Sequence, residues 1–287
     1  MADAAPAIAV LLQAAAQRLR NALALEQREA RLEARLLAAE ALGADAAWLI
    51  AHERETFAEP ARTIFFALLE RRLAGEPVAY LRGTKEFFGR SFQVGPAVLV
   101  PRPETELLVE TALAALPAGQ AARVLDLGTG SGAIALTLAL ERPAWEIYAS
   151  DASLSALAVA QANARRLGAE RVRLLAADWW APVACVKFFD MILSNPPYVA
   201  EGDSHLAALA HEPRLALAAA DAGRAALTAI IAGAPRRLGR GGWLWVEHGW
   251  DQGAWCRQKL AEAGFGEIQT HRDTAGLDRV SGAKVSE

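Results

Sequence analysis

The ten residues 124–133, VLDLGTGSGA, decide the fold of most of this chain. Their apolar start predicts a short buried strand, and the glycines let the chain turn sharply from that strand into a helix. Such a turn also lets a ligand approach the backbone, and the first N–H groups of the following helix are free to bind it. We therefore expect ligand contacts from the loop residues Gly128, Thr129, Gly130, Ser131 and Gly132.

Strands and helices alternate along the chain from this point. Apolar runs predict strands, and periodic segments closed by Pro143 and Gly168 predict helices between them. This order predicts an α/β, Rossmann-like, doubly wound sheet of mostly parallel strands, with ligands at the carboxyl ends of the strands. Strands are expected at 124–127, 146–149, 172–175, 189–193 and 243–246, and helices at 134–140 and 154–167.

The part of the chain before the α/β pattern is helical. Leu32 and Leu36 recur at helical spacing, and a helix at 64–73 is followed by the stop signal Gly75. No strand and no cluster of catalytic side chains is recognised there. We expect residues 1–84 to form a small helical bundle.

Residues 85–287 are expected to form the second domain, which begins with a β-hairpin or linker at 85–106. Within that linker, 86–94 and 98–100 read as extended chain. Thr105 or a neighbour is expected to cap a helix that follows at 107–116.

The composition of the 287 residues excludes several classes of protein. Hydrophobic residues make up 53% of the chain, which indicates a folded globular protein, and the formal charge of −3 gives no electrostatic basis for nonspecific nucleic-acid binding. Two isolated cysteines, Cys185 and Cys256, predict neither a disulfide framework nor a zinc site, and no other metal site is expected. Because neither a signal peptide nor a membrane span is recognised, we expect a cytoplasmic protein.

Asp151 stands at the tip of the second predicted strand. A carboxylate there can accept hydrogen bonds from both hydroxyls of a ribose. Gly128, Gly130 and Ala133 also satisfy the dinucleotide fingerprint, so a nicotinamide oxidoreductase has to be considered. Asp126 argues against that class, because its negative charge would repel a pyrophosphate and attract a sulfonium ligand.

The third predicted strand leads into Asp178 and Trp179. Asp178 can bind the edge of an adenine, and Trp179 can pack against the face of the ring. Ordinary core packing is the competing interpretation for Trp179, because the next residue is also a tryptophan, Trp180.

The fourth strand runs directly into Asn195, Pro196, Pro197 and Tyr198. A rigid turn that merely ends the strand would also explain two prolines. The functional interpretation is stronger, because the glycine loop and Asp151 are predicted at the same edge of the sheet.

The chemistry of this tetrapeptide suits a planar nitrogen as methyl acceptor. The lone pair of an amide or aromatic amine is delocalised, so the nitrogen must be held in the reactive orientation. Asn195 Oδ1 and the carbonyl of Pro196 can accept its N–H bonds, and the two prolines fix these acceptors in place. Tyr198 offers a face for packing. We expect Asn195, Pro196 and Tyr198 to be catalytic.

Taken together, these features resemble the bacterial peptide chain release factor glutamine methyltransferase family. The resemblance implies S-adenosylmethionine as cofactor and, as substrate, the side-chain amide of the glutamine in the Gly-Gly-Gln motif of class-1 release factors. It also implies that Asn195 contacts the cofactor, that Asn195, Pro196, Pro197 and Tyr198 hold the glutamine, and that the helical domain at 1–84 recognises the release factor. We expect a monomer that needs no nucleic acid. The matching segments are EFFG at 86–89, PRPETE at 101–106, DLGTGSGAIAL at 126–136, NPPY at 195–198, EPRLAL at 212–217 and EHG at 247–249.

Other classes of protein remain open on the sequence alone. A methyltransferase of a ribosomal-protein glutamine and a DNA or ribosomal RNA base methyltransferase share the tetrapeptide. The segment 101–106 argues against the first, and the acidic balance argues against the second. If the protein were a nicotinamide oxidoreductase, Asn195 would have no role. If it were a noncatalytic binding module, the presence of every expected site residue would be unexplained.

Overall fold

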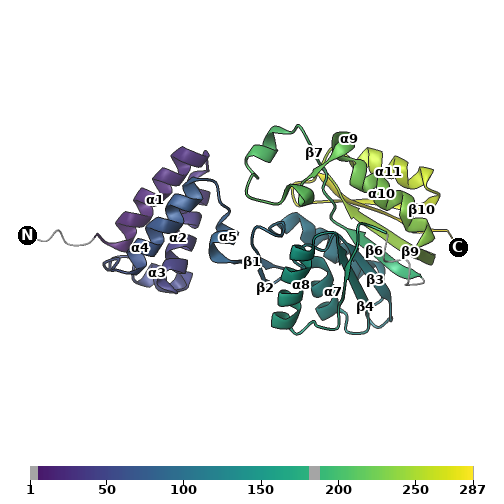
Figure 1. The fold of residues 1–287 in the computed structure, drawn as a ribbon, viewed down its shortest axis with the longest axis horizontal. Coiled ribbons are helices and arrows are strands. Elements are labelled where there is room, and N and C mark those ends of the chain that lie inside the picture. The colour runs from purple at the N-terminus through teal and green to yellow at the C-terminus, as the bar shows by residue number, and fades with distance from the viewer. Residues whose placement is uncertain (1–5, 181–187, 287) are drawn as a thin grey trace, which may run out of the picture. The chain divides into compact units, whose positions relative to one another are not determined.

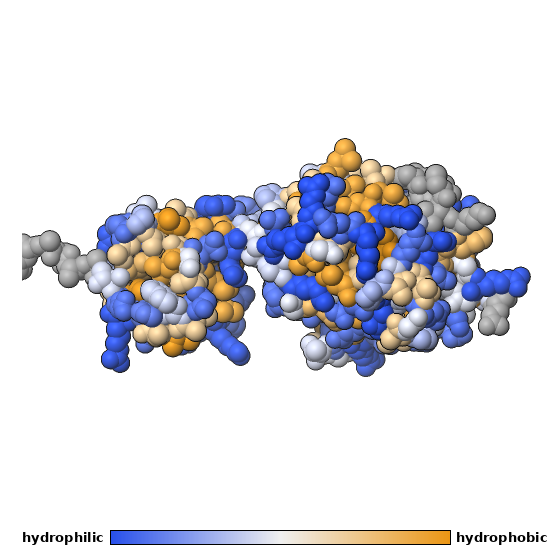
Figure 2. Space-filling model, turned by 90° about the horizontal axis from the view of Figure 1, so that it is seen from below, coloured by the Kyte–Doolittle hydropathy of each residue, from blue (hydrophilic) through white to orange (hydrophobic). Residues whose placement is uncertain are grey.

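The computed structural model describes residues 6–180 and 188–286. The chain divides into two compact units, Met1–Gly83 and Thr84–Glu287 (Figure 1). Hydrophilic and hydrophobic residues are mixed on the face of each unit that Figure 2 shows. Cys256 is buried, whereas Cys185 lies outside the described residues. In the described part of the chain no helix has the length and apolar character needed to cross a membrane.

The first unit is a bundle of helices around its own apolar core. Leu19, Leu37, Phe65 and Leu69 are completely buried in this core. Gly43 ends the second helix in the left-handed conformation, which a glycine adopts without steric cost. The helices are α1 (Ile8–Leu23), α2 (Gln27–Leu42), α3 (Ala46–Ala51), α4 (Ala61–Leu73) and α5 (Val78–Arg82).

The second unit is built on a seven-stranded sheet with the order β10-β11-β9-β6-β3-β4-β5. The five strands from β9 to β5 are parallel, which confirms the predicted doubly wound sheet. β11 pairs antiparallel with β9 and β10. The strands are β3 (Arg123–Leu127), β4 (Glu146–Asp151), β5 (Arg173–Ala176), β6 (Phe189–Ser194), β9 (Leu238–Glu247), β10 (Phe265–Arg272) and β11 (Asp278–Val285).

Helices cover both faces of this sheet (Figure 1). Along β9, Trp243 and Trp245 point into one apolar core, and Leu244 and Val246 point into the other. This alternation is the two-residue period of a strand that is buried on both faces. One core lies under α6 (Glu106–Ala115), α7 (Ala133–Glu141) and α8 (Leu154–Leu167), and the other under α10 (Ala225–Gly233) and α11 (Gly253–Glu262).

The segment before α6 contains the predicted hairpin. It consists of β1 (Thr84–Phe87) and β2 (Arg90–Gln93), whose turn is made by Phe88 and Gly89 with φ values of 50° and 70°. Residues 98–100, which were predicted to be extended chain, are not part of a strand. Their backbone follows an irregular path that continues into the short helix η1 (Pro103–Thr105).

A second small pairing follows the tetrapeptide at the end of β6. β7 (Val199–Ala200) pairs in parallel with β8 (Ala218–Ala219), and the short helix α9 (Ala220–Gly223) comes next. This pairing brings the segment after Tyr198 beside the segment that contains the EPRLAL motif.

Candidate active site

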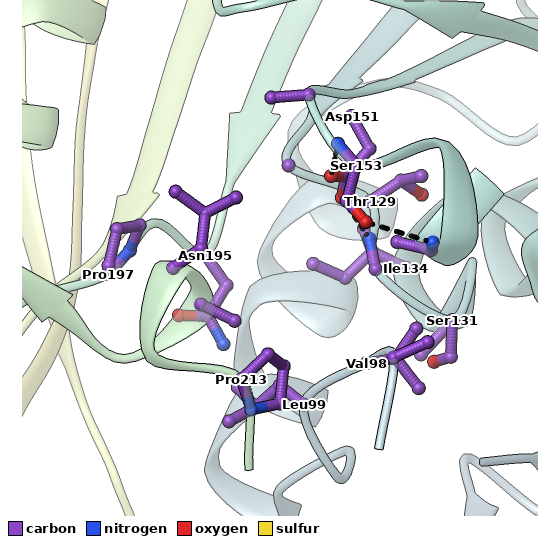
Figure 3. Close-up of a pocket in the computed structure, with 18 of the residues that line it drawn as sticks. Val98, Leu99, Thr129, Ser131, Ile134, Asp151, Ser153, Asn195, Pro197 and Pro213 are labelled. Carbon is purple, nitrogen blue, oxygen red and sulfur yellow. Dashed lines mark hydrogen bonds between the residues drawn. The ribbon is translucent and has the colours of Figure 1, made fainter. Parts of the chain in front are cut away.

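A cavity of about 230 Å³ opens at the carboxyl ends of the parallel strands. Figure 3 shows Asn195 and Pro197 on one side of it and Thr129, Asp151 and Ser153 on the other. The sheet therefore brings most of the predicted site residues together. Those that line the cavity are Gly128, Thr129, Gly130, Ser131, Asp151, Asp178, Trp179, Asn195 and Pro197.

The glycine loop is shaped by left-handed backbone at three positions. Gly128, Gly130 and Gly132 have φ values of 74°, 55° and 84°, which an L side chain rarely adopts. Gly132 has a second reason to be glycine, because an added Cβ would lie 2.8 Å from Leu136 Cδ1. It does not line the cavity, so its contribution is the close packing of α7 behind the loop.

Asp151 ends β4 with its carboxylate fixed by backbone donors. Oδ2 accepts a hydrogen bond from Gly130 N over 2.9 Å, and Oδ1 accepts one from Ser153 N over 2.8 Å. Each carboxylate oxygen has a second lone pair that remains for a ligand. The side chain therefore couples the shape of the glycine loop to a preorganised pair of acceptors in the cavity.

Asp126 does not have the role that its sequence position suggested. It is completely buried at the end of β3, does not line the cavity, and accepts a hydrogen bond from Thr129 Oγ1 over 2.7 Å. Burial raises the pKa of its carboxyl to about 7, so its charge is only partial at neutral pH. Asp126 supports the glycine loop from inside instead of facing a cationic ligand.

The two neighbouring tryptophans have different surroundings. Trp180 Nε1 donates to the carbonyl of Ala229 over 2.9 Å, and its ring packs so close to Gly233 that a side chain there would collide with it. Trp179 has a φ of 48° and lines the cavity above Gly128. Both rings therefore pack against the same apolar core, and the left-handed backbone of Trp179 brings its ring to the cavity as well.

The tetrapeptide after β6 is divided between the cavity and the interior. Asn195 and Pro197 line the cavity, whereas Pro196 and Tyr198 do not. The Tyr198 hydroxyl donates to Glu247 Oε1 over 3.2 Å, and burial raises its pKa. Its phenol thus anchors the tetrapeptide, and the packing face predicted for Tyr198 is not part of the cavity wall.

Several cavity residues lie outside the predicted set of site residues. They include Val98, Leu99, Arg102, Thr105, Pro213, Leu215, Ala216 and Ala218. An ion pair of 2.5 Å joins Arg102 Nη2 to Glu212 Oε1, and Glu212 Oε2 accepts from Val100 N over 2.9 Å. The sequence signal for this wall was the pair of motifs PRPETE and EPRLAL. The ion pair between Arg102 and Glu212 joins these two motifs in the folded chain.

Comparisons with known proteins agree with this geometry. Residues 103–221 match the family model "Methyltransferase small domain", and residues 11–83 match "PrmC N-terminal domain". A solved structure described as a methyltransferase from Pyrococcus furiosus superposes with a TM-score of 0.54 at 18% identity, over 76% of this chain and 98% of that one. At this identity the likeness supports the fold alone.

Curated relatives are much more similar in sequence. The release factor glutamine methyltransferase of Bordetella pertussis is 52% identical over 88% of this chain and 94% of its own length. The one from Burkholderia pseudomallei is 46% identical over 88% of this chain and 92% of its own length, and the one from Escherichia coli is 48% identical over 75% and 78%.

The doubly wound sheet and the cavity at its carboxyl edge, with the matching family model, define the chain as a methyltransferase. The high sequence identity to the curated relatives, over most of the chain, identifies the family within this class. The chain belongs to the release factor glutamine methyltransferase family, as its motifs predicted.

Proposed function

We propose that the protein transfers the methyl group of S-adenosylmethionine to the side-chain amide nitrogen of the Gly-Gly-Gln glutamine in class-1 release factors. The observation that carries this proposal is the state of the Asn195 amide. Its Nδ2 is engaged by Thr105, and within the described residues its Oδ1 has no donor although Asn195 lines the cavity. A free amide oxygen at this place is an acceptor for an amide N–H.

The residues on the opposite side of the cavity fit the cofactor. The Asp151 carboxylate suits the two hydroxyls of a ribose, and the glycine loop leaves room for the methionine part beside its backbone. Trp179 and Asp178 would bind the face and the edge of the adenine. S-Adenosylmethionine supplies an electrophilic methyl group on a sulfonium when it is bound.

The chain's contribution to the reaction is orientation. A substrate amide that donates an N–H to Asn195 Oδ1 turns its nitrogen lone pair toward the methyl group. The second acceptor expected from the sequence, the carbonyl of Pro196, belongs to a residue that does not line the cavity. Fixing two reactants in this way can lower a barrier by roughly 7–11 kcal/mol. No general base has to remove a proton before the nitrogen–carbon bond forms, because the cationic product can lose its proton to water afterwards.

The helical unit is the proposed site for the protein substrate. Its match to "PrmC N-terminal domain" supports this assignment. Action as a monomer in the cytoplasm, on free release factor without nucleic acid, belongs to the same proposal.

Mass spectrometry of a release factor incubated with the protein and S-adenosylmethionine tests the function. The expected result is a gain of one CH₂ unit on the peptide that contains Gly-Gly-Gln, located on the glutamine by fragmentation. Asn195→Ala should abolish the gain while cofactor affinity changes by less than about tenfold. Ribosomal protein and nucleic acid are incubated in parallel. If one of these is methylated while the release factor stays unmodified, the proposal is refuted.

A further inference from the structure

A chain of side chains leads from Asn195 into the interior. Asn195 Nδ2 donates to Thr105 Oγ1 over 3.0 Å, and the Thr105 hydroxyl lies beside the carboxyl of Glu247, where it favours the ionised form. Glu247 Oε2 is buried without a partner in the described part of the chain, so it is open to the Thr105 hydroxyl proton. The Tyr198 hydroxyl donates to the same carboxyl. Glu247, at the end of β9, is therefore linked to both ends of the tetrapeptide, to Tyr198 directly and to Asn195 through Thr105.

The direction of these hydrogen bonds is determined by Glu247. An ionised carboxylate can only accept, so the single hydroxyl proton of Thr105 must point at Glu247. The Thr105 oxygen then offers only lone pairs to Asn195. An amide nitrogen can donate to those lone pairs and an amide oxygen cannot, so the nitrogen of Asn195 turns inward and Oδ1 is left free.

Thr105 is suited to this task because its hydroxyl is not used elsewhere. The residue stands at the N-terminus of α6, where a threonine commonly caps the helix, and the sequence predicted a cap from it or a neighbour. Its side chain makes no capping hydrogen bond, and the residue is only 4% exposed. The hydroxyl is thus diverted from the helix to the pair of Asn195 and Glu247.

We propose that Thr105 and Glu247 are positioning residues, which hold the Asn195 amide with its nitrogen inward and its oxygen available to the substrate amide. The inference rests on the proposed function, because it assigns to Asn195 Oδ1 the N–H of the substrate. It also gives the PRPETE segment a role in the reaction: the segment supplies the hydroxyl that sets the orientation of the tetrapeptide's asparagine.

The same geometry makes the orientation depend on pH. Glu247 is 1% exposed, and burial raises the pKa of its carboxyl to about 7. The charged or titratable groups that act on it are Tyr198, Arg279 and Glu104: the Tyr198 hydroxyl and the Arg279 cation favour the ionised carboxyl, and the Glu104 anion opposes it. A protonated Glu247 can donate to Thr105, which frees the Thr105 proton for Asn195 Oδ1 and permits the opposite, unproductive orientation.

Isosteric replacement of Thr105 tests the role of the hydroxyl. Thr105→Val should lower kcat about tenfold or more, because the loss of one hydrogen bond reduces the population of the productive Asn195 orientation by about that factor. The KM for release factor and the Kd for cofactor should stay within about threefold of their original values. Thr105→Ser, which restores the hydroxyl, should return kcat to within about threefold of the original value. A Thr105→Val protein with unchanged kcat would overturn the proposal.

Thr137→Val is the matched control. Thr137 is a fully buried threonine of α7 whose hydroxyl has no hydrogen-bond partner in the described part of the chain. The same loss of a hydroxyl there should leave kcat unchanged. An equal loss of kcat in both valine variants would show a general effect of buried valine on the fold and would refute the specific role of Thr105.

The pH profile of kcat at saturating substrates tests Glu247. In the wild-type protein kcat should fall as the pH decreases through about 7, and Glu247→Gln should have a lower kcat without this acidic limb. Asp126, whose carboxyl titrates in the same range, is present in both proteins, so the difference belongs to Glu247. An acidic limb unchanged in Glu247→Gln would contradict the proposed role of Glu247.

Failure of the proposed function can be distinguished from failure of the positioning role. If the wild-type protein does not methylate the release-factor glutamine, the function itself is wrong, whatever the variants do. If the wild type methylates it and the Thr105 and Glu247 variants keep the wild-type kcat and pH profile, only the positioning role is refuted.

Discussion

At the scale of single residues, Asp151 has two structural hydrogen bonds and a proposed contact with ribose. Asp151→Ala removes the proposed charged acceptor and should weaken cofactor binding by about 10- to 100-fold, since hydrogen bonds to a charged group are worth about 1.5–3 kcal/mol. Isothermal titration calorimetry with S-adenosylmethionine measures this loss. An unchanged Kd would remove Asp151 from the cofactor site.

Asp190→Ala is the control for this substitution. The Asp190 carboxylate also accepts a backbone N–H, that of Arg123 over 2.7 Å, but at the amino ends of the parallel strands. The variant loses a comparable structural hydrogen bond far from the carboxyl edge. Its cofactor affinity should equal that of the wild type, and a similar loss in both variants would indicate a general effect on the sheet.

The neighbouring tryptophans show how far single residues could be predicted. Asp178, Trp179 and Asn195 were placed at the correct edge, because the carboxyl ends of parallel strands converge. The distinction between Trp179 and Trp180 could not be made, since it depends on a φ of 48° and on the close approach of Gly233. Asp126 was misjudged because its burial is a property of the folded loop and not of its place in the motif.

At the scale of elements, the cavity wall depends on the contact of Arg102 with Glu212. Glu212 is only 4% exposed and accepts from both Arg102 and the backbone of Val100. Glu212→Gln puts an amide that cannot satisfy both donors at this buried position. We expect it to lower the free energy of unfolding by about 1–3 kcal/mol, measured by urea denaturation, and to weaken cofactor binding.

The exposed pair of Lys259 and Glu262 supplies the control for that variant. Its two charges lie 2.6 Å apart on the surface of α11, where solvent screens them. Glu262→Gln should leave both the unfolding free energy and the cofactor affinity unchanged. If Glu212→Gln proves equally silent, the wall is held by its backbone and apolar contacts instead of by the ion pair.

Elements were predictable where local signals agreed with tertiary structure. The bounds of α8 are those predicted, since Ser153 caps its start and Gly168 ends it in the left-handed conformation. β10 and β11 were not predicted. β10 has intermediate or exposed side chains after its first residue, and the buried centre of β11 contains Ser281, Gly282 and Ala283, which have little strand preference. Gly282 is required there because a side chain would collide with the Trp245 ring.

At the scale of the whole molecule, each compact unit has its own apolar core. Residues such as Leu19, Leu37 and Phe65 form one core in Met1–Gly83, and the two cores that flank the sheet lie in Thr84–Glu287. All residues that line the cavity belong to the second unit. Binding of the cofactor and recognition of the protein substrate can therefore be separated by experiment.

Removal of Met1–Gly83 is the corresponding test. Because the cavity lies within Thr84–Glu287, the truncated protein should bind S-adenosylmethionine with a Kd within about threefold of that of the full chain. Without the proposed grip on the release factor, kcat/KM for the intact factor should fall by more than about tenfold, because binding energy from remote contacts is lost. A short peptide that contains Gly-Gly-Gln cannot use those contacts, so both proteins should methylate it at equal rates. Equal losses with the intact factor and the short peptide would instead mean that the helical unit only stabilises the catalytic unit.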